Sequence, residues 1–158
     1  MSEQVDAARV KELARAMGAD KVGITTPEGF HLPEWTRAVI VLAQATLDEA
    51  WDYELRMVYD GRYFWSKPIY ERLTAIAARL ALALEQAGFR SEPLTFDDSI
   101  SLIDLRVAAV RAGLGVRGLN GLVLTREYGP RVRFGACLLY TSDAADDLLC
   151  VDLGGRRI

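Results

Sequence analysis

Four glycines fall within nine positions of this sequence, at a spacing that could bring the backbone against a ligand. They are Gly113, Gly115, Gly118 and Gly121. Glycine tolerates positive φ angles and lets another group approach the main chain closely, at a cost in conformational entropy. The pattern predicts a helix that ends at Gly113, followed by a glycine-rich loop. The alternative is a tight helix-to-strand connection with a glycine at the end of the helix.

Nucleotide-binding motifs do not account for this loop. Gly113, Gly115 and Gly118 have the spacing GxGxxG, but the dinucleotide fingerprint requires a strand before the glycines and a helix after them. Here the order is reversed, because residues 122–125 predict a short strand, and a turn at residues 128–130 leads to a second one. No lysine-serine pair follows that would make a phosphate loop. A nucleotide is therefore a weak interpretation.

Polar side chains precede the helix that is expected to lead into the loop. Asp97, Asp98 and Ser99 stand there, and short side-chain oxygens accept hydrogen bonds from the free N–H groups at a helix start. Their simplest role is N-capping. His31 is the only histidine and lies in a loop rich in proline and glycine. It could act as a metal ligand or proton donor, but no second histidine or cysteine lies nearby, so we expect a surface role.

Aromatic residues concentrate between positions 47 and 66. They are Trp51, Tyr53, Tyr59, Tyr63, Phe64 and Trp65. Aromatic side chains bury large areas, so these rings could pack in a core or against a helix. They could equally form a wall over a large planar ligand, and the sequence leaves both interpretations open.

Two amphipathic helices are predicted by apolar residues at three- and four-residue steps. The first covers residues 6–17, and the second begins at Pro68 and ends at Gly88. Proline is tolerated at the first helical position because its missing N–H would have no partner there. The breadth of the second apolar stripe indicates that this helix packs on the core.

Strands are expected between and after these helices. Residues 21–26 read as a short strand, and residues 37–43 are a continuous apolar run, typical of a strand buried on both faces. Residues 89–96 predict a strand interrupted at Pro93, which places it at the edge of a sheet. This mixture of helices and strands suits an α/β or α+β domain.

Composition indicates a single globular domain. The chain has 158 residues, of which 51% are hydrophobic and 26% charged. No apolar run is long enough to span a bilayer and no signal peptide opens the chain, so we expect no membrane association and a cytoplasmic location. The net charge of −3 gives no basic surface of the kind that binds nucleic acid.

The last residues have a different character. Residues 137–158 follow neither a strand nor a helix period for long. They resemble the translated sequencing-adapter sequence found at the ends of metagenomic open reading frames, and we interpret them as a non-native tail; the alternative is a short native extension. The two cysteines of the chain, Cys137 and Cys150, both lie in this tail. We therefore expect no disulfide, metal site or iron–sulfur site in residues 1–136.

The glycine segment resembles the central part of the cobalamin-dependent reductases, a family that includes epoxyqueuosine reductases and reductive dehalogenases. The shared features are the AGLG of residues 112–115, Gly118, Asn120 and the turn at Tyr128–Gly129. Val116 and Leu119 stand where epoxyqueuosine reductases carry tryptophan and lysine. The sequence PRVR at residues 130–133 is closer to the dehalogenase-like branches. The resemblance covers roughly residues 6–136.

The resemblance implies an α+β fold, a nitroreductase-like sheet sandwich flanked by helices, with residues 1–136 forming an incomplete cobalamin-binding domain. It implies that backbone of the glycine loop and the following turn contacts the corrin. The residues carried over as cofactor-binding are Gly113, Leu114, Gly115, Gly118, Asn120, Tyr128, Gly129 and Arg133. Asp98 is carried over as the proton donor, with Asp104 as the second choice, and such a carboxyl would need a pKa raised by burial.

The resemblance also implies two 4Fe–4S clusters in a region that would follow this segment, where they supply electrons to the cobalt. The substrate would be a small molecule, such as an organohalide, or a modified nucleoside. Three functions remain open. The first is a fragment of a cobalamin-dependent reductase, the second a corrinoid-binding or trafficking module without redox activity, and the third a flavin reductase. We expect that the fragment does not turn over without the iron–sulfur region.

Overall fold

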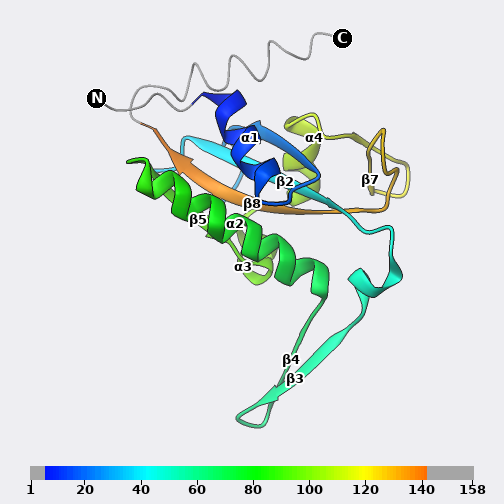
Figure 1. The fold of residues 1–158 in the computed structure, drawn as a ribbon. Helices are drawn as coiled ribbons and strands as arrows, with labels where there is room; N and C mark the ends of the chain where they lie inside the picture. The colour runs from blue at the N-terminus through cyan, green and yellow to red at the C-terminus, as the bar shows by residue number, and fades with distance from the viewer. Residues whose placement is uncertain (1–5, 142–158) are drawn as a thin grey trace.

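A four-stranded antiparallel sheet forms the centre of the computed structural model, which describes residues 6–141 without the side chains of Asp97, Asp98 and Ile100. The strands lie side by side in the order β1 (Lys21–Thr25), β2 (Ala38–Ala45), β8 (Val132–Tyr140) and β5 (Arg90–Leu94) (Figure 1). The three expected strands are confirmed. The strand that contains Pro93 lies at the sheet edge, as predicted, and pairs with β8 alone.

Both faces of the sheet are buried, and β2 shows why its sequence is apolar without interruption. Successive side chains of a strand point to opposite faces. Ile40 and Leu42 belong to the hydrophobic core on one face, whereas Val39 and Val41 belong to the core on the other. All four are fully buried.

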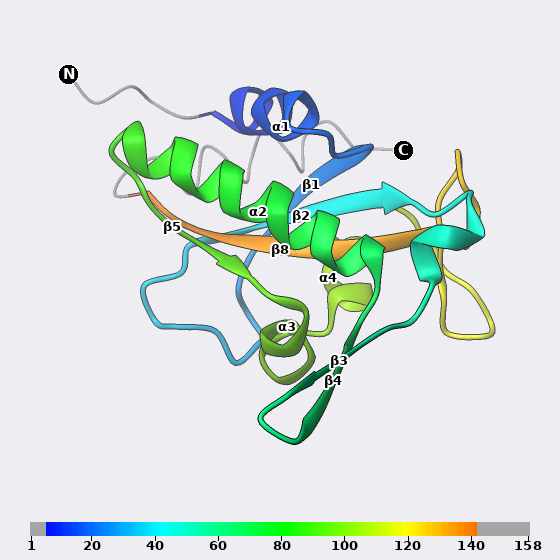
Figure 2. The same ribbon diagram turned by 60° about the horizontal axis from the view of Figure 1, so that its bottom comes forward.

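Helices cover the two faces in separate layers, as Figure 2 shows. α1 (Ala7–Ala16) and α2 (Pro68–Gln86) lie over one face, and α3 (Phe96–Leu102) and α4 (Leu105–Arg111) lie on the opposite side. The prediction of a mixed helix-and-sheet fold is confirmed, and the nitroreductase-like detail stays a prediction. Within residues 6–141 no helix combines the length and apolar character needed to cross a membrane.

The helix that leads into the glycine loop begins later than expected. Asp97, Asp98 and Ser99 lie within α3, and a separate helix, α4, continues to the loop. The side chain of Asp104 caps α4, accepting hydrogen bonds from the backbone N–H of Arg106 at 3.0 Å and of Val107 at 3.4 Å. The prediction that the earlier group caps this helix was therefore wrong, because the chain turns between Leu102 and Leu105.

The aromatic segment forms a hairpin that projects from the body of the protein (Figure 1). A short 3-10 helix, η1 (Glu49–Asp52), precedes strands β3 (Leu55–Tyr59) and β4 (Arg62–Ser66). Their turn places Asp60 and Gly61 at φ 49° and 71°, the conformation that favours an Asp-Gly pair. Tyr59 and Tyr63 are 77% and 82% exposed. Core packing was therefore the wrong interpretation for Tyr59 and Tyr63. Of the six aromatic residues of this segment, Trp51 packs against the core, and Trp65 contacts Phe96 of α3, as expected for packing against a helix.

The central strand continues beyond residue 136, where we expected the domain to end. Within β8, Cys137 pairs with Ile40 of β2 and with Pro93 of β5, and Leu138 and Leu139 are fully buried. Burial raises the pKa of the Cys137 thiol to about 12, so the thiol stays protonated at neutral pH. Residues 137–140 are part of the sheet, and residues 142–158 of the proposed tail lie outside the described residues.

We predict that a chain ending at residue 136 unfolds, whereas a chain ending at Thr141 keeps the fold. Burial of one leucine side chain stabilises a protein by about 1.5–3 kcal/mol, so losing Leu138 and Leu139 removes a large share of a typical domain stability of about 5–15 kcal/mol. Thermal unfolding followed by circular dichroism would compare the two chains. Equal melting temperatures would contradict the role given to the end of β8.

Candidate functional site

The glycine segment folds as a loop closed by a very small hairpin. α4 ends at Arg111, and Gly113 follows with φ 71°, a conformation that glycine adopts without strain. β6 (Val116–Arg117) then pairs with β7 (Val123–Leu124). The predicted break at Gly113 and the strand near residues 122–125 are both present, although this strand pairs with β6 and not with the main sheet.

Packing inside the loop explains why Gly115 has no side chain. A Cβ at this position would collide with the carbonyl oxygen of Leu124 and would lie 2.9 Å from Cγ1 of Val123. A larger residue would therefore displace β7 from β6. Whatever the loop binds, the close approach at Gly115 is made by the protein's own backbone.

Side-chain hydrogen bonds fix the two turns that follow. Oδ1 of Asn120 accepts a hydrogen bond from the backbone N–H of Leu122 at 3.1 Å. The hydroxyl of Thr125 accepts from the backbone N–H of Tyr128 at 3.0 Å and donates to the carbonyl of Gly129 at 3.1 Å. Gly129 adopts φ 56°. These hydrogen bonds constrain the end of the loop and the turn that follows it.

A cavity of about 540 Å³ opens beside this loop, and we call it the arginine cavity. Three arginines line it: Arg106 from α4, and Arg131 and Arg133 from the turn and the start of β8. Leu122 and Val123 of the loop also line it, with further apolar walls from Leu105, Val132 and Phe134. The cavity therefore combines an apolar lining with a set of cations.

Asp52 is the only carboxylate in the lining of the arginine cavity among the side chains that the structure describes, and two cations share it. Its Oδ1 lies 3.2 Å from a terminal nitrogen of Arg133 and 3.6 Å from Nζ of Lys67, and the same nitrogen of Arg133 donates to Oδ2 at 3.4 Å. Within the described residues, neither cation is aligned to donate a hydrogen bond to the buried Oδ1. One negative charge therefore faces two positive charges.

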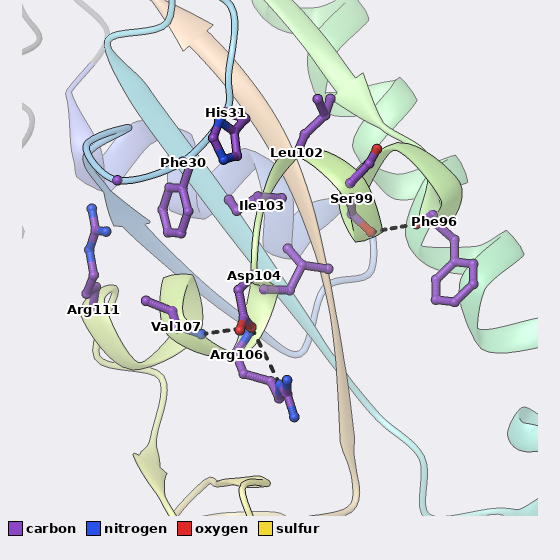
Figure 3. Close-up of a pocket in the computed structure, with 13 residues that line it drawn as sticks. Phe30, His31, Phe96, Ser99, Leu102, Ile103, Asp104, Arg106, Val107 and Arg111 are labelled. Carbon is purple, nitrogen blue, oxygen red and sulfur yellow. Dashed lines mark hydrogen bonds and ion pairs between the residues drawn. The ribbon is translucent and has the colours of Figure 1, made fainter.

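A second cavity, of about 750 Å³, lies beside the segment that joins α3 to α4, and we call it the His31 cavity (Figure 3). It shares Phe96, Leu105 and Arg106 with the arginine cavity. The backbone N–H of His31 donates to the carbonyl of Leu102 at 2.9 Å, which ties the loop to α3. His31 itself is exposed, as expected for a loop residue.

Aromatic rings form the boundary between the arginine cavity and a smaller hollow of about 300 Å³. The ring of Phe96 stacks on Tyr70 with centroids 3.9 Å apart, and it meets Trp65 edge-on at 5.7 Å. Trp65 and Phe64 of the hairpin line the smaller hollow. Two of the rings considered as a wall over a planar ligand therefore face a concave surface.

The predicted site residues do not all meet at one cavity. Among the predicted cofactor-binding residues, Arg133 lines the arginine cavity. Neither the arginine cavity nor the His31 cavity is lined by the other seven, which are Gly113, Leu114, Gly115, Gly118, Asn120, Tyr128 and Gly129. Leu114 is buried in the core beneath the loop. Asp104 lines the His31 cavity, and Asp98 lies in α3 with its side chain outside the described part of the structure.

Sequence reasoning missed Arg106, Arg131 and Asp52 as lining residues. A signal was available for one of them, because Arg131 and Arg133 are two positions apart at the start of a strand, and such residues share a face. Nothing local in the sequence connects Asp52 to Arg133, since 81 positions separate them.

Comparison with known proteins finds relatives of two kinds. No family model matches the chain. Among curated proteins, a tetrachloroethene reductive dehalogenase from Desulfitobacterium hafniense is 38% identical over 64 residues, which are 40% of this chain and 11% of that protein. A similar enzyme from Dehalobacter restrictus is 36% identical over the same length.

Solved structures extend the likeness to most of the chain. An epoxyqueuosine reductase from Streptococcus thermophilus superimposes with a TM-score of 0.61 at 18% identity, covering 85% of this chain and 46% of that one. A catabolic reductive dehalogenase gives a TM-score of 0.65 at 18% identity, covering 84% of this chain and 20% of that one. The chain thus spans less than half the length of these relatives.

The predicted resemblance is confirmed: the chain has the fold of a part of the epoxyqueuosine reductases and reductive dehalogenases, and over 64 residues its sequence is similar to that of the dehalogenases.

Proposed function

We propose that this chain is the cobalamin-binding part of a cobalamin-dependent reductase. The observation that carries the proposal is the arginine cavity, which Leu122 and Val123 at the end of the glycine segment line together with the start of β8. Those two segments carry the AGLG and PRVR sequences of the resemblance. A solved reductive dehalogenase with the same fold is described as B12-dependent, which supports the choice of cofactor.

The residues present suit a large ligand with apolar faces and polar edges, as a corrinoid is. The arginine cavity and the His31 cavity adjoin at Phe96, Leu105 and Arg106, and the arginine cavity and the hollow at Trp65 adjoin at Tyr70 and Phe96. Leu122 and Val123 would meet an apolar face of the ligand, and Arg133 would meet a polar edge. When bound, the cofactor would supply the reducing electrons to the substrate.

Asp98 is our candidate for the residue that provides the proton. Converting a carbon–halogen bond to a carbon–hydrogen bond consumes two electrons and one proton and releases a halide ion. In the sequence of α3, Asp98 stands between Phe96 and Ser99, which both line the His31 cavity, and this neighbourhood supports the choice. Asp104 is less suited, because its carboxylate already accepts two backbone hydrogen bonds at the start of α4.

Electrons would come from two 4Fe–4S clusters in a part of the reductase beyond this segment. The matched relatives are more than twice as long as the aligned part, which leaves room for such a region in them. We propose an organohalide as the substrate class, because the sequence likeness is to dehalogenases. A modified nucleoside in tRNA is the second candidate, since one solved epoxyqueuosine reductase of this fold is described with a tRNA stem loop.

Titration of the full chain with cobalamin tests the proposal, with visible absorbance as the readout. We predict saturable binding with the spectrum of base-off cobalamin. Leu122→Gln should weaken it by several-fold to about tenfold, because an apolar contact is lost. Leu82→Gln should leave the affinity unchanged. Leu82 is 55% exposed, comparable to the 44% of Leu122, and it lines neither the arginine cavity nor the His31 cavity.

A folded chain that binds no cobalamin would contradict the proposal. Binding of a flavin in its place would favour the flavin reductase. Cobalamin binding together with a complete gene that encodes no cysteine clusters would favour a corrinoid-binding module without redox activity.

Asp98→Asn should separate proton supply from cofactor binding. We predict unchanged cobalamin affinity, because the change keeps the size of the side chain. With titanium(III) citrate supplying electrons and an aryl halide as substrate, the rate of halide release should fall by about 10²–10⁴-fold, the usual contribution of a positioned acid. Equal rates at equal cobalamin occupancy would exclude Asp98 as the proton donor.

A further inference from the structure

The arginine cavity carries more positive charge than the protein itself neutralises. Among the residues that the structure describes, its lining and the residues paired with that lining contain four cations, Arg106, Arg131, Arg133 and Lys67, against two carboxylates, Asp52 and Asp104. We propose that the arginine cavity binds an oxyanion, a phosphate or a carboxylate, carried by a ligand with an apolar body.

Arg131 is the cation that is free to meet this anion. Its backbone is fixed on both sides, since its N–H donates to the carbonyl of Tyr128 at 3.1 Å and its carbonyl accepts from the N–H of Thr46 at 3.0 Å. Its guanidinium has no partner among the residues that the structure describes, whereas those of Arg106 and Arg133 are paired with Asp104 and Asp52. A guanidinium presents a planar set of donors that matches carboxylate and phosphate oxygens.

Arg133 adds a second cation on the same side of the cavity. It is two positions from Arg131, and its guanidinium is half-buried and oriented by the carbonyl of Val132 at 3.1 Å and by Asp52. Because Lys67 also lies near Asp52, that carboxylate does not cancel the charge of Arg133 alone. Partial burial lowers the screening by water, so an anion placed here is attracted more strongly than at an open surface.

The remaining walls select for an organic anion over a free inorganic one. Leu105, Leu122, Val123, Val132 and Phe134 line the cavity beside the arginines. A volume of about 540 Å³ lies in the range of small-molecule sites, which combine apolar walls with a few placed polar groups.

Two ligands could bring the same oxyanion chemistry to this cavity. One is the phosphodiester in the nucleotide tail of a corrinoid, and that case rests on the proposed function. The other is the carboxylate of a substrate. Both require Arg131, and a set of three probes distinguishes them: cobalamin, cobinamide, which has the corrin without the nucleotide phosphodiester, and benzoate.

The experiment is equilibrium binding of each probe to the full chain and to Arg131→Gln, with Arg79→Gln as the matched control. Arg79 is an exposed arginine of α2 that lines none of the described cavities. Arg131→Gln should keep the circular dichroism spectrum and melting temperature of the parent chain, because its guanidinium makes no described contact. Loss of a charge-assisted contact should weaken binding by about tenfold or more.

Weaker binding of cobalamin with unchanged binding of cobinamide would show that the cavity takes the phosphodiester. Weaker binding of benzoate alone would show that it takes a carboxylate. Unchanged binding of all three probes would overturn the oxyanion site, and the cobalamin proposal would stand if cobinamide still bound. If benzoate bound through Arg131 and neither corrinoid bound, the oxyanion site would stand and the proposed cofactor would fall.

Discussion

The burial of β8 between two helical layers is the constraint on which this structure depends. Alternate residues of the strand, Cys137 and Leu139 against Ala136 and Leu138, contribute to the two cores on opposite faces of the sheet. A strand fixed in this way, with β2 and β5 paired on either side, cannot shift register without exposing one of its apolar faces. That register also sets the positions of Arg131, Arg133 and the preceding turn at the N-terminal end of β8.

The candidate site lies where β8 begins. The strand enters the sheet at Val132, where Arg131 and Arg133 line the arginine cavity together with Leu122 and Val123. Glycines in this loop allow α4, β6 and β7 to pack closely, as the contact between Gly115 and Leu124 shows. The loop therefore acts as a rigid support for the cavity wall, and the side chains that would meet a ligand belong to Leu122, Val123 and the arginines.

The sequence predicted the elements whose periodicity is strong and missed those that depend on contacts between distant residues. β2 and α2 were predictable because one is an unbroken apolar run and the other repeats apolar residues at helical steps. The β3–β4 hairpin was missed although Asp60-Gly61 is a turn signal, because its strands are exposed and no buried face imposes an alternating apolar pattern on them. Asp104 was recognised as a second-choice proton donor, but capping competes for the same carboxylate, and only the break between α3 and α4 showed which helix it caps.

Hydrogen–deuterium exchange of the full chain, with and without cobalamin, would test the central claim most directly. If the cofactor binds at the face formed by the glycine loop, α4 and the start of β8, protection should increase within residues 96–106 and 114–134 and should leave α1 and the solvent face of α2 unchanged. Protection confined to α1 and α2, or none at a cobalamin concentration that saturates binding, would contradict the assignment of this face as the corrinoid site.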